Sequence, residues 1–151
     1  MKFYSQTVVL NAKSKRKTTS LVPFLSAAVK KSGVRKGTVT VQSHHTTAGI
    51  ISQENEAGIL RYDLPRLLDT LVPGNIDYRH DDMGKRRPRV GPRERKNARA
   101  HLEYALVAHP SVTLIVRYGK IVLGDWLSVL FVDFDRGRRK ARKISIAVMG
   151  E

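Results

Sequence analysis

The sequence predicts a single α+β domain over residues 1–151, with a largely antiparallel or mixed β-sheet and two to three helices. The length of 151 residues suits one domain. Several short apolar runs are typical of strands, and longer segments repeat apolar residues at helical spacing. The elements begin in the order β-α-β-β-α and end with about four strands. Because strands and helices do not alternate strictly, a doubly wound parallel sheet is not favoured.

Strands are predicted where apolar and polar residues alternate, or where an apolar run lasts only a few positions. In chain order, the predicted strands cover residues 3–10, 37–44, 48–52, 112–116, 121–123, 126–134 and 144–149. Four of them follow one another at the C-terminal end of the chain. That succession fits an antiparallel or mixed sheet better than a parallel one.

Three helices are predicted from apolar stripes and from their start and stop signals. The first begins after the capping oxygens of residues 18–20, carries Pro23 in its first turn and stops at Gly33. The second covers about 57–71, and the third covers 97–107. The long loop between them is a candidate for function, since long loops in compact domains often carry it.

Charge is the largest anomaly in the composition. The chain has 28 Lys and Arg against 13 Asp and Glu, a net charge of +15. The basic residues cluster in 13–17, 85–99 and 136–143. A field of this sign favours anionic partners such as nucleic acids and phosphorylated metabolites. Solvated loops, or adaptation to heat or salt, explain the clusters equally well, and few aromatic residues lie among them for base stacking.

Several classes of protein are excluded by what the sequence lacks. There is no cysteine, which excludes disulfide frameworks, thiolate metal sites and cysteine nucleophiles. Apolar runs are strand-sized and the N-terminus has no signal-peptide stretch, so a soluble cytoplasmic protein without a membrane partner is expected. Neither a P-loop nor a Gly-x-Ser-x-Gly elbow occurs. DNA-recognition helices are hard to place in so strand-rich a chain.

Three histidines are candidates for chemistry. His45 follows a predicted strand, His80 lies in the long loop and His101 lies in the third predicted helix. Imidazole is a good ligand for zinc and related metals and a good acid or base near neutral pH. Their spacing matches no local metal motif, so histidines scattered over loops and bonded to the backbone are the alternative.

An acidic and amide segment follows the strand at 48–52. Glu54 or Asn55 could orient a histidine or bind a substrate amide. The alternative is that Asn55 and Glu56 cap the helix that follows, because these residue types suit its first turn.

The segment His45-Thr46-Thr47-Ala48-Gly49, followed by Gln53-Glu54-Asn55-Glu56, resembles the HTTA and NEN motifs of the YjbQ-like family of secondary thiamine-phosphate synthase enzymes. Further landmarks agree in order and spacing over essentially the whole chain: Tyr78-x-His80, Asn97-x-x-Ala100-His101-Leu102, Gly119-x-Ile121-x-Leu123-Gly124-x-Trp126 and Met149-Gly150-Glu151. The chain departs from the family at Asp125 and Leu127, where members carry Thr and Gln.

The resemblance implies a small homotrimeric enzyme that acts on phosphorylated metabolites. The implied reaction joins a pyrimidine-methyl diphosphate to a thiazole phosphate, with release of pyrophosphate. His45, His80 and His101 are expected to share one pocket near a subunit contact. They would be catalytic residues or ligands of zinc or another divalent metal.

The resemblance also places Glu54 and Asn55 beside that pocket as catalytic residues. Arg99 and Arg136 are the candidates for binding the anionic substrate, because cationic side chains stabilise charge on a leaving diphosphate. The competing hypothesis is a basic nucleic-acid-binding or scaffold protein without catalytic activity, in which the charge itself is the function.

Overall fold

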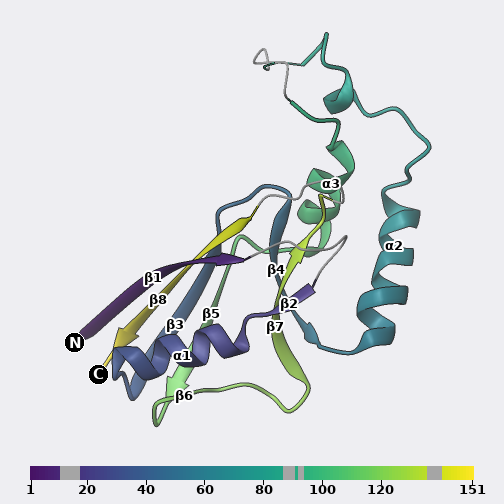
Figure 1. Cartoon of the computed structure of the whole chain (residues 1–151). Helices are drawn as coiled ribbons and strands as arrows, with labels where there is room; N and C mark the ends of the chain where they lie inside the picture. Colours follow the sequence, from purple (N-terminus) through teal and green to yellow (C-terminus); the bar gives the residue numbers. More distant parts are fainter. Residues whose placement is uncertain (11–17, 87–90, 92–93, 136–140) are drawn as a thin grey trace.

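Two antiparallel β-sheets and three α-helices make up the computed structural model, which describes residues 1–10, 18–86, 91, 94–135 and 141–151. This architecture confirms the predicted α+β class. In the five-stranded sheet the order is β1 (Lys2–Leu10), β8 (Arg142–Gly150), β3 (Lys36–Ser43), β5 (Ser111–Arg117) and β6 (Lys120–Ile121). In the three-stranded sheet it is β2 (Thr18–Ser20), β7 (Leu127–Asp133) and β4 (Ala48–Glu54) (Figure 1).

The first helix packs its apolar stripe onto the five-stranded sheet. α1 (Val22–Ser32) buries Leu25 and Val29 there, against alternate residues of the central strands such as Val39 and Ile146. Alternation is expected for strands that bury one face and expose the other. Gly33 ends the helix with φ of 64°, the left-handed conformation that glycine adopts without steric cost.

The three-stranded sheet is buried on both faces and forms the middle layer of the molecule. Ile50 and Phe131 point into the core that contains α1. Their neighbours Ile51 and Leu130 point the other way, into a second core with α2 (Leu64–Leu71) and α3 (Ala98–Val107). Strands β4 and β7 therefore read as nearly continuous apolar runs, and they hold the two cores together.

Residues 18–20 do not cap α1 as predicted. They form β2, which pairs with β7, and the cap position is taken by Leu21, with no side-chain hydrogen bond. Local sequence favoured a cap because Ser and Thr are good capping residues. The backbone groups of these residues are instead used in the ladder with β7, a partner more than a hundred residues away along the chain.

The second predicted helix is interrupted. Ile59–Asp63 forms a π-helical turn, η1, and the regular α-helix begins only at Leu64. Pro65 gives the physical reason, because a proline has no N–H to bond back along the helix and its ring crowds the preceding turn. Among the described residues, none of the helices combines the length and the apolar composition that a membrane span requires.

Candidate functional site

Gly49 allows α3 to lie directly on β4. A Cβ atom at this position would come within 2.5 Å of the Tyr104 ring and 2.9 Å of the Ala108 side chain. No other residue type leaves room for so close an approach. Tyr104 lies one turn along α3 from His101, so this packing sets where His101 lies. The His101 ring lies near the segment before β4, close enough for the backbone of Thr46 to act on its pKa.

His80 is held against the start of the same helix. It lies in the 3-10 turn η2 (Arg79–Asp81), and Asp81 Oδ1 accepts a hydrogen bond from the backbone N–H of Ala98 at 3.0 Å. His80 Nε2 lies 3.3 Å from Asn97 Oδ1, which fits an N–H donor on the ring. Asn97 and His101 are four residues apart and share one side of the helix. The hydrogen bond to Asn97 therefore places the His80 ring next to His101.

The two imidazoles form a pair. The ring centroids of His80 and His101 are 4.8 Å apart and the ring planes are inclined by 58°. Both side chains are only partly buried, so a ligand can reach them. The structure thus brings together two of the three histidines predicted to share a site, although 20 residues separate them along the chain.

The pKa of His101 lies below its ordinary value. Burial is the largest cause, and the neighbouring His80 and the Arg86 guanidinium lower it further. The Thr46 carbonyl and the Asp135 carboxylate act in the opposite direction but are outweighed. His101 is therefore neutral at pH 7 and can accept a proton there.

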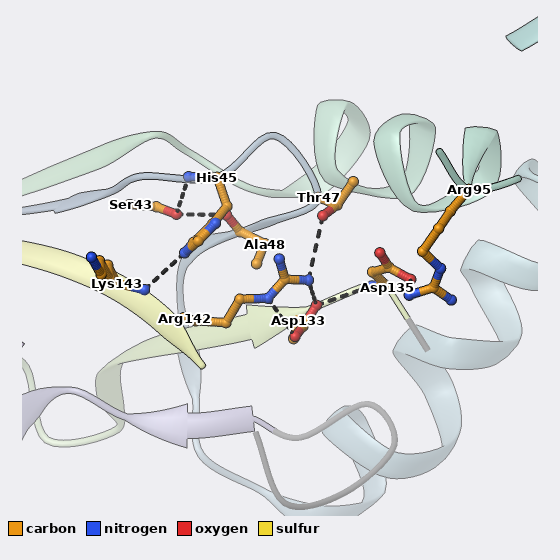
Figure 2. A network of polar contacts seen from close by, with 9 residues as sticks. All are labelled: Ser43, His45, Thr47, Ala48, Arg95, Asp133, Asp135, Arg142 and Lys143. Carbon is orange, nitrogen blue, oxygen red and sulfur yellow. Dashed lines mark hydrogen bonds and ion pairs between the residues drawn. The ribbon is translucent and has the colours of Figure 1, made fainter. Parts of the chain in front are cut away.

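His45 lies on the turn beside this pair, but its ring is directed to the start of β8. Figure 2 shows it reaching Lys143, whose backbone N–H donates to His45 Nε2 at 2.8 Å. The backbone N–H of His45 donates in turn to Ser43 Oγ at 3.3 Å. A neutral ring that accepts at Nε2 carries its proton on Nδ1, so neither nitrogen presents a free lone pair to a metal ion.

The three histidines therefore do not form a ready metal site in this arrangement. Within the described ranges, no three His, Asp or Glu side chains are grouped closely enough to hold a metal ion. Zinc or another divalent metal at this place stays a prediction, which metal analysis of the purified protein would test.

A buried ion pair supports the turn that carries His45 and Thr46. Arg142, at the start of β8, is 1% exposed, and its Nε donates to Asp133 Oδ2 at 2.7 Å. Its Nη2 donates to Asp133 Oδ1 and to Thr47 Oγ1, the latter at 3.4 Å (Figure 2). One guanidinium thus connects β8, the end of β7 and the turn before β4.

Asp135 continues this network toward α3. Its backbone N–H donates to Asp133 Oδ1 at 3.1 Å, and its own Oδ1 lies 3.3 Å from Arg95 Nη1. The side chain is 4% exposed. The sequence pattern marks neither aspartate, because Asp133 ends the apolar strand β7 and Asp135 lies two residues beyond it. The available signal was a pair of carboxylates at the end of an apolar run, where charged side chains are rarely buried without a partner.

Glu54 and Asn55 lie at the far end of β4 from the histidines. Glu54 pairs with Leu127 at the start of β7, whereas Ala48 pairs with Asp133 at its end. Six residues of strand separate the two ends by about 20 Å. Within one chain, these residues therefore do not adjoin the imidazole pair.

Glu56, rather than Asn55, satisfies the start of the helical segment after β4. Its two carboxylate oxygens accept hydrogen bonds from the backbone N–H groups of Gly58 and Ile59, at 2.7 Å and 2.9 Å. These bonds hold the pKa of Glu56 below its ordinary value. Of the two residues expected to cap this helical segment, Glu56 does so.

Arg99 points away from the imidazole pair. It is two residues from His101 on α3, and such residues face opposite sides of a helix. Its Nη2 contacts carboxylate oxygens of both Asp69 and Glu103, so it connects α3 to α2. This position favours a structural role over the predicted role in substrate binding. Arg136, the other predicted substrate-binding residue, lies outside the described residues.

A hollow of about 1020 Å³ adjoins the site along the segment that contains His80. Arg79, Asp81 and Lys96 are among the residues that line it, whereas neither imidazole does. Its mixed charge gives no clear preference for one sign of ligand. We therefore centre the candidate site on the histidine pair.

The family model that describes the UPF0047 protein YjbQ-like family matches residues 6–151. The chain belongs to this family. A UPF0047 protein of Methanocaldococcus jannaschii is 28% identical over 142 residues, which cover 94% of this chain and 91% of that protein. Another, from Archaeoglobus fulgidus, is 36% identical over 106 residues, 70% of this chain and 74% of that protein.

Solved structures of the family share the fold. A YjbQ-like protein of unknown function from Sulfolobus solfataricus superposes with a TM-score of 0.82 at 23% identity, covering 99% of this chain and 98% of that one. An uncharacterised family member from Clostridium acetobutylicum gives a TM-score of 0.77 at 27% identity, covering 95% and 99%. These comparisons establish family and fold, and they leave the activity to be inferred from the site.

Replacing Arg142 with Met should lower the free energy of unfolding by about 3–5 kcal/mol, because it leaves the Asp133 carboxylate buried without its cation. Denaturant unfolding measures this loss. The matched change Arg117→Met, on an exposed position of β5, should cost less than about 0.5 kcal/mol. The double variant Arg142→Met, Asp133→Leu should recover part of the loss. Equal losses in the two single Arg variants would contradict the assigned pair.

The pH titration of His101, followed by NMR of its ring protons, should have its midpoint below the ordinary value of 6.5. The change His80→Gln should raise that midpoint, because it removes a neighbour that lowers the pKa of His101. Since the unfolded chain then binds the proton more readily than the folded one, stability should fall as the pH drops through 6.5 toward the folded pKa. A midpoint at or above 6.5 in the wild type would refute this account.

Proposed function

We propose that the chain is an enzyme that binds a phosphorylated small molecule beside His80 and His101 and uses the imidazole pair to move a proton. The observation that carries the proposal is the pairing of these rings at a partly exposed position. Arg86 is close enough to act on the charge of His101. A neutral imidazole beside a guanidinium suits a phosphate ester, since one group exchanges a proton and the other stabilises negative charge.

The basic residues near the site support this proposal over the nucleic-acid alternative. Within the described part of the 85–99 cluster, four cations contact carboxylates of the same chain. These pairs are Lys85 with Asp82, Arg86 with Glu94, Arg95 with Asp135, and Arg99 with Asp69 and Glu103. Cations that already have carboxylate partners gain less from the extended charge of a phosphate backbone than free ones do. Arg86 differs from the other three because its charge also acts on His101, so a small phosphate at the imidazole pair comes within its reach. Much of the charge here is therefore used within the fold.

The resemblance of the motifs to those of secondary thiamine-phosphate synthase enzymes suggests the finer reaction. In it, a thiazole nitrogen would form a bond to the methylene carbon of a pyrimidine-methyl diphosphate as the carbon–oxygen bond to diphosphate breaks. The leaving pyrophosphate would be stabilised by cationic side chains at the site, and the histidines would serve as acid and base. The relatives described above have no assigned activity in their names, so this reaction is proposed as the first substrate pair to test.

Binding of inorganic pyrophosphate, measured by calorimetry at 0.15 M salt, tests the proposal. His101→Gln and His80→Gln should each weaken binding by about tenfold or more, because each removes a group at the ligand. His109→Gln is the matched control, since His109 is exposed and lies after α3. Undiminished pyrophosphate binding in both site variants, together with salt-dependent DNA binding, would favour the nucleic-acid alternative instead.

We further propose that the chain assembles as a homotrimer. Large apolar side chains stay exposed on the outer helical layer, with Leu67 and Leu71 of α2 and Leu106 of α3 each more than half exposed. Leu67 and Leu71 are four residues apart and share one side of α2, and adjoining exposed leucines often mark a contact surface. A second chain could also bring its own Glu54 and Asn55 toward a histidine pair, which one chain by itself does not do.

Light scattering during gel filtration should give a mass three times the 17.0 kDa of one chain. Leu67→Glu and Leu71→Glu should lower the mass toward that of one chain, because a charge buried in a contact without a partner is costly. Thr70→Glu, on the same helix at another exposed position, is the control. A wild-type mass of one chain would contradict the trimer without affecting the assignment of the histidine pair.

A further inference from the structure

Asp135 has an unmet hydrogen-bonding capacity. Its side chain is 4% exposed, and Oδ1 is engaged by Arg95. The other oxygen, Oδ2, is buried and has no hydrogen-bond partner among the residues that the structure describes. By contrast, both carboxylate oxygens of Asp133, two residues earlier, accept hydrogen bonds from Arg142. Buried polar atoms in proteins are normally paired, and an exception calls for a cause.

The position of Asp135 suggests the cause. The backbone N–H of Phe134 donates to the Thr47 carbonyl at 3.0 Å, so Asp135 comes directly after a residue bonded to the turn that adjoins His101. The charge of Asp135 also acts on His101, in agreement with this placement. Its partner Arg95 is 41% exposed, which places this end of the network at the border of solvent. Figure 2 shows Asp135 between Asp133 and Arg95, at the end of the network nearest α3. A ligand that enters beside His101 therefore comes close to an acceptor that the fold leaves unused.

We propose that Asp135 is a ligand-binding residue of the His80–His101 site, and that its Oδ2 accepts a hydrogen bond from an N–H or O–H group of the phosphorylated ligand. This inference rests on the proposed function and adds a chemical feature of the substrate that the site would bind. The substrate carries an amino, amidine or hydroxyl donor within a few bonds of its phosphate. The guanidinium and imidazoles hold the phosphate end, and the carboxylate selects the donor end.

Binding of three phosphate esters of similar size distinguishes the contribution of the donor group from that of the phosphate. Ethyl phosphate has no donor, whereas 2-hydroxyethyl phosphate and 2-aminoethyl phosphate add an O–H and an ammonium group. Wild-type protein should bind at least one of the two donor compounds about tenfold more tightly than ethyl phosphate, because a hydrogen bond to a buried carboxylate is charge-assisted. The stronger of the two identifies the kind of donor.

Asp135→Ala should abolish this preference while leaving the binding of ethyl phosphate within about twofold of wild type. If that variant does not fold, Asp135→Asn keeps the shape and removes the charge, and it should reduce the preference at least severalfold. Arg95→Lys is the matched control, because it changes the other partner of Asp135 but keeps a positive charge there and leaves Oδ2 in place. The preference should survive in it.

The outcomes separate the two proposals. Equal wild-type affinity for the three phosphates, or a preference that persists in Asp135→Ala and Asp135→Asn, would overturn the role of Asp135 alone. Ethyl phosphate binding that is weakened by His101→Gln would then still support the proposed function. Failure of all three phosphates to bind the wild-type protein would overturn both.

Discussion

The Arg142–Asp133 ion pair connects the parts of the chain on which the candidate site is built. Removing two charges from water is costly, and the cost is offset only where both groups are fully hydrogen-bonded. Here the guanidinium donates to both carboxylate oxygens and also reaches Thr47. Thr47 follows the residue whose carbonyl meets His101, and Asp133 precedes Asp135 by two. The pair thus fixes the backbone on both sides of the imidazole site.

Two close contacts then determine where the imidazoles lie. Gly49 lets α3 approach β4 to a distance that any side chain would prevent, and this places His101 over the turn at Thr46. Asn97, at the start of the helix, bonds to His80 from the preceding long loop. The result is a pair of rings supplied by a helix and a loop but positioned by a strand. Such a pair keeps its geometry while one side remains open to a ligand.

Much of the fold could be predicted, because alternation and helical spacing are local signals. The strands around Val39 and Ile146 follow directly from burial on one face. The errors have two causes. Thr18–Ser20 pairs with β7, a distant contact that overrides the local preference for a cap. Pro65 is a local cause, because it interrupts a segment whose leucines predict a regular helix and a π-helical turn precedes it. A sheet partner far along the chain is not visible in a short window of sequence.

The site was predictable only in part, for related reasons. His80 and His101 were chosen from their residue type and a family resemblance, and their pairing depends on Asn97, which no spacing rule reveals. Asp135 lies just beyond an apolar strand, and the need of a buried carboxylate for a partner becomes visible only in three dimensions. Glu54 was placed beside the histidines by resemblance, yet the length of β4 keeps it at the other end of the sheet.

A crystal structure of the protein soaked with pyrophosphate tests the central claim most directly. The account predicts anion density within hydrogen-bonding distance of His80 or His101, with the two rings still adjacent and Arg142 still paired to Asp133. Rings that lie on separate surfaces, or an anion bound only away from both histidines, would contradict it.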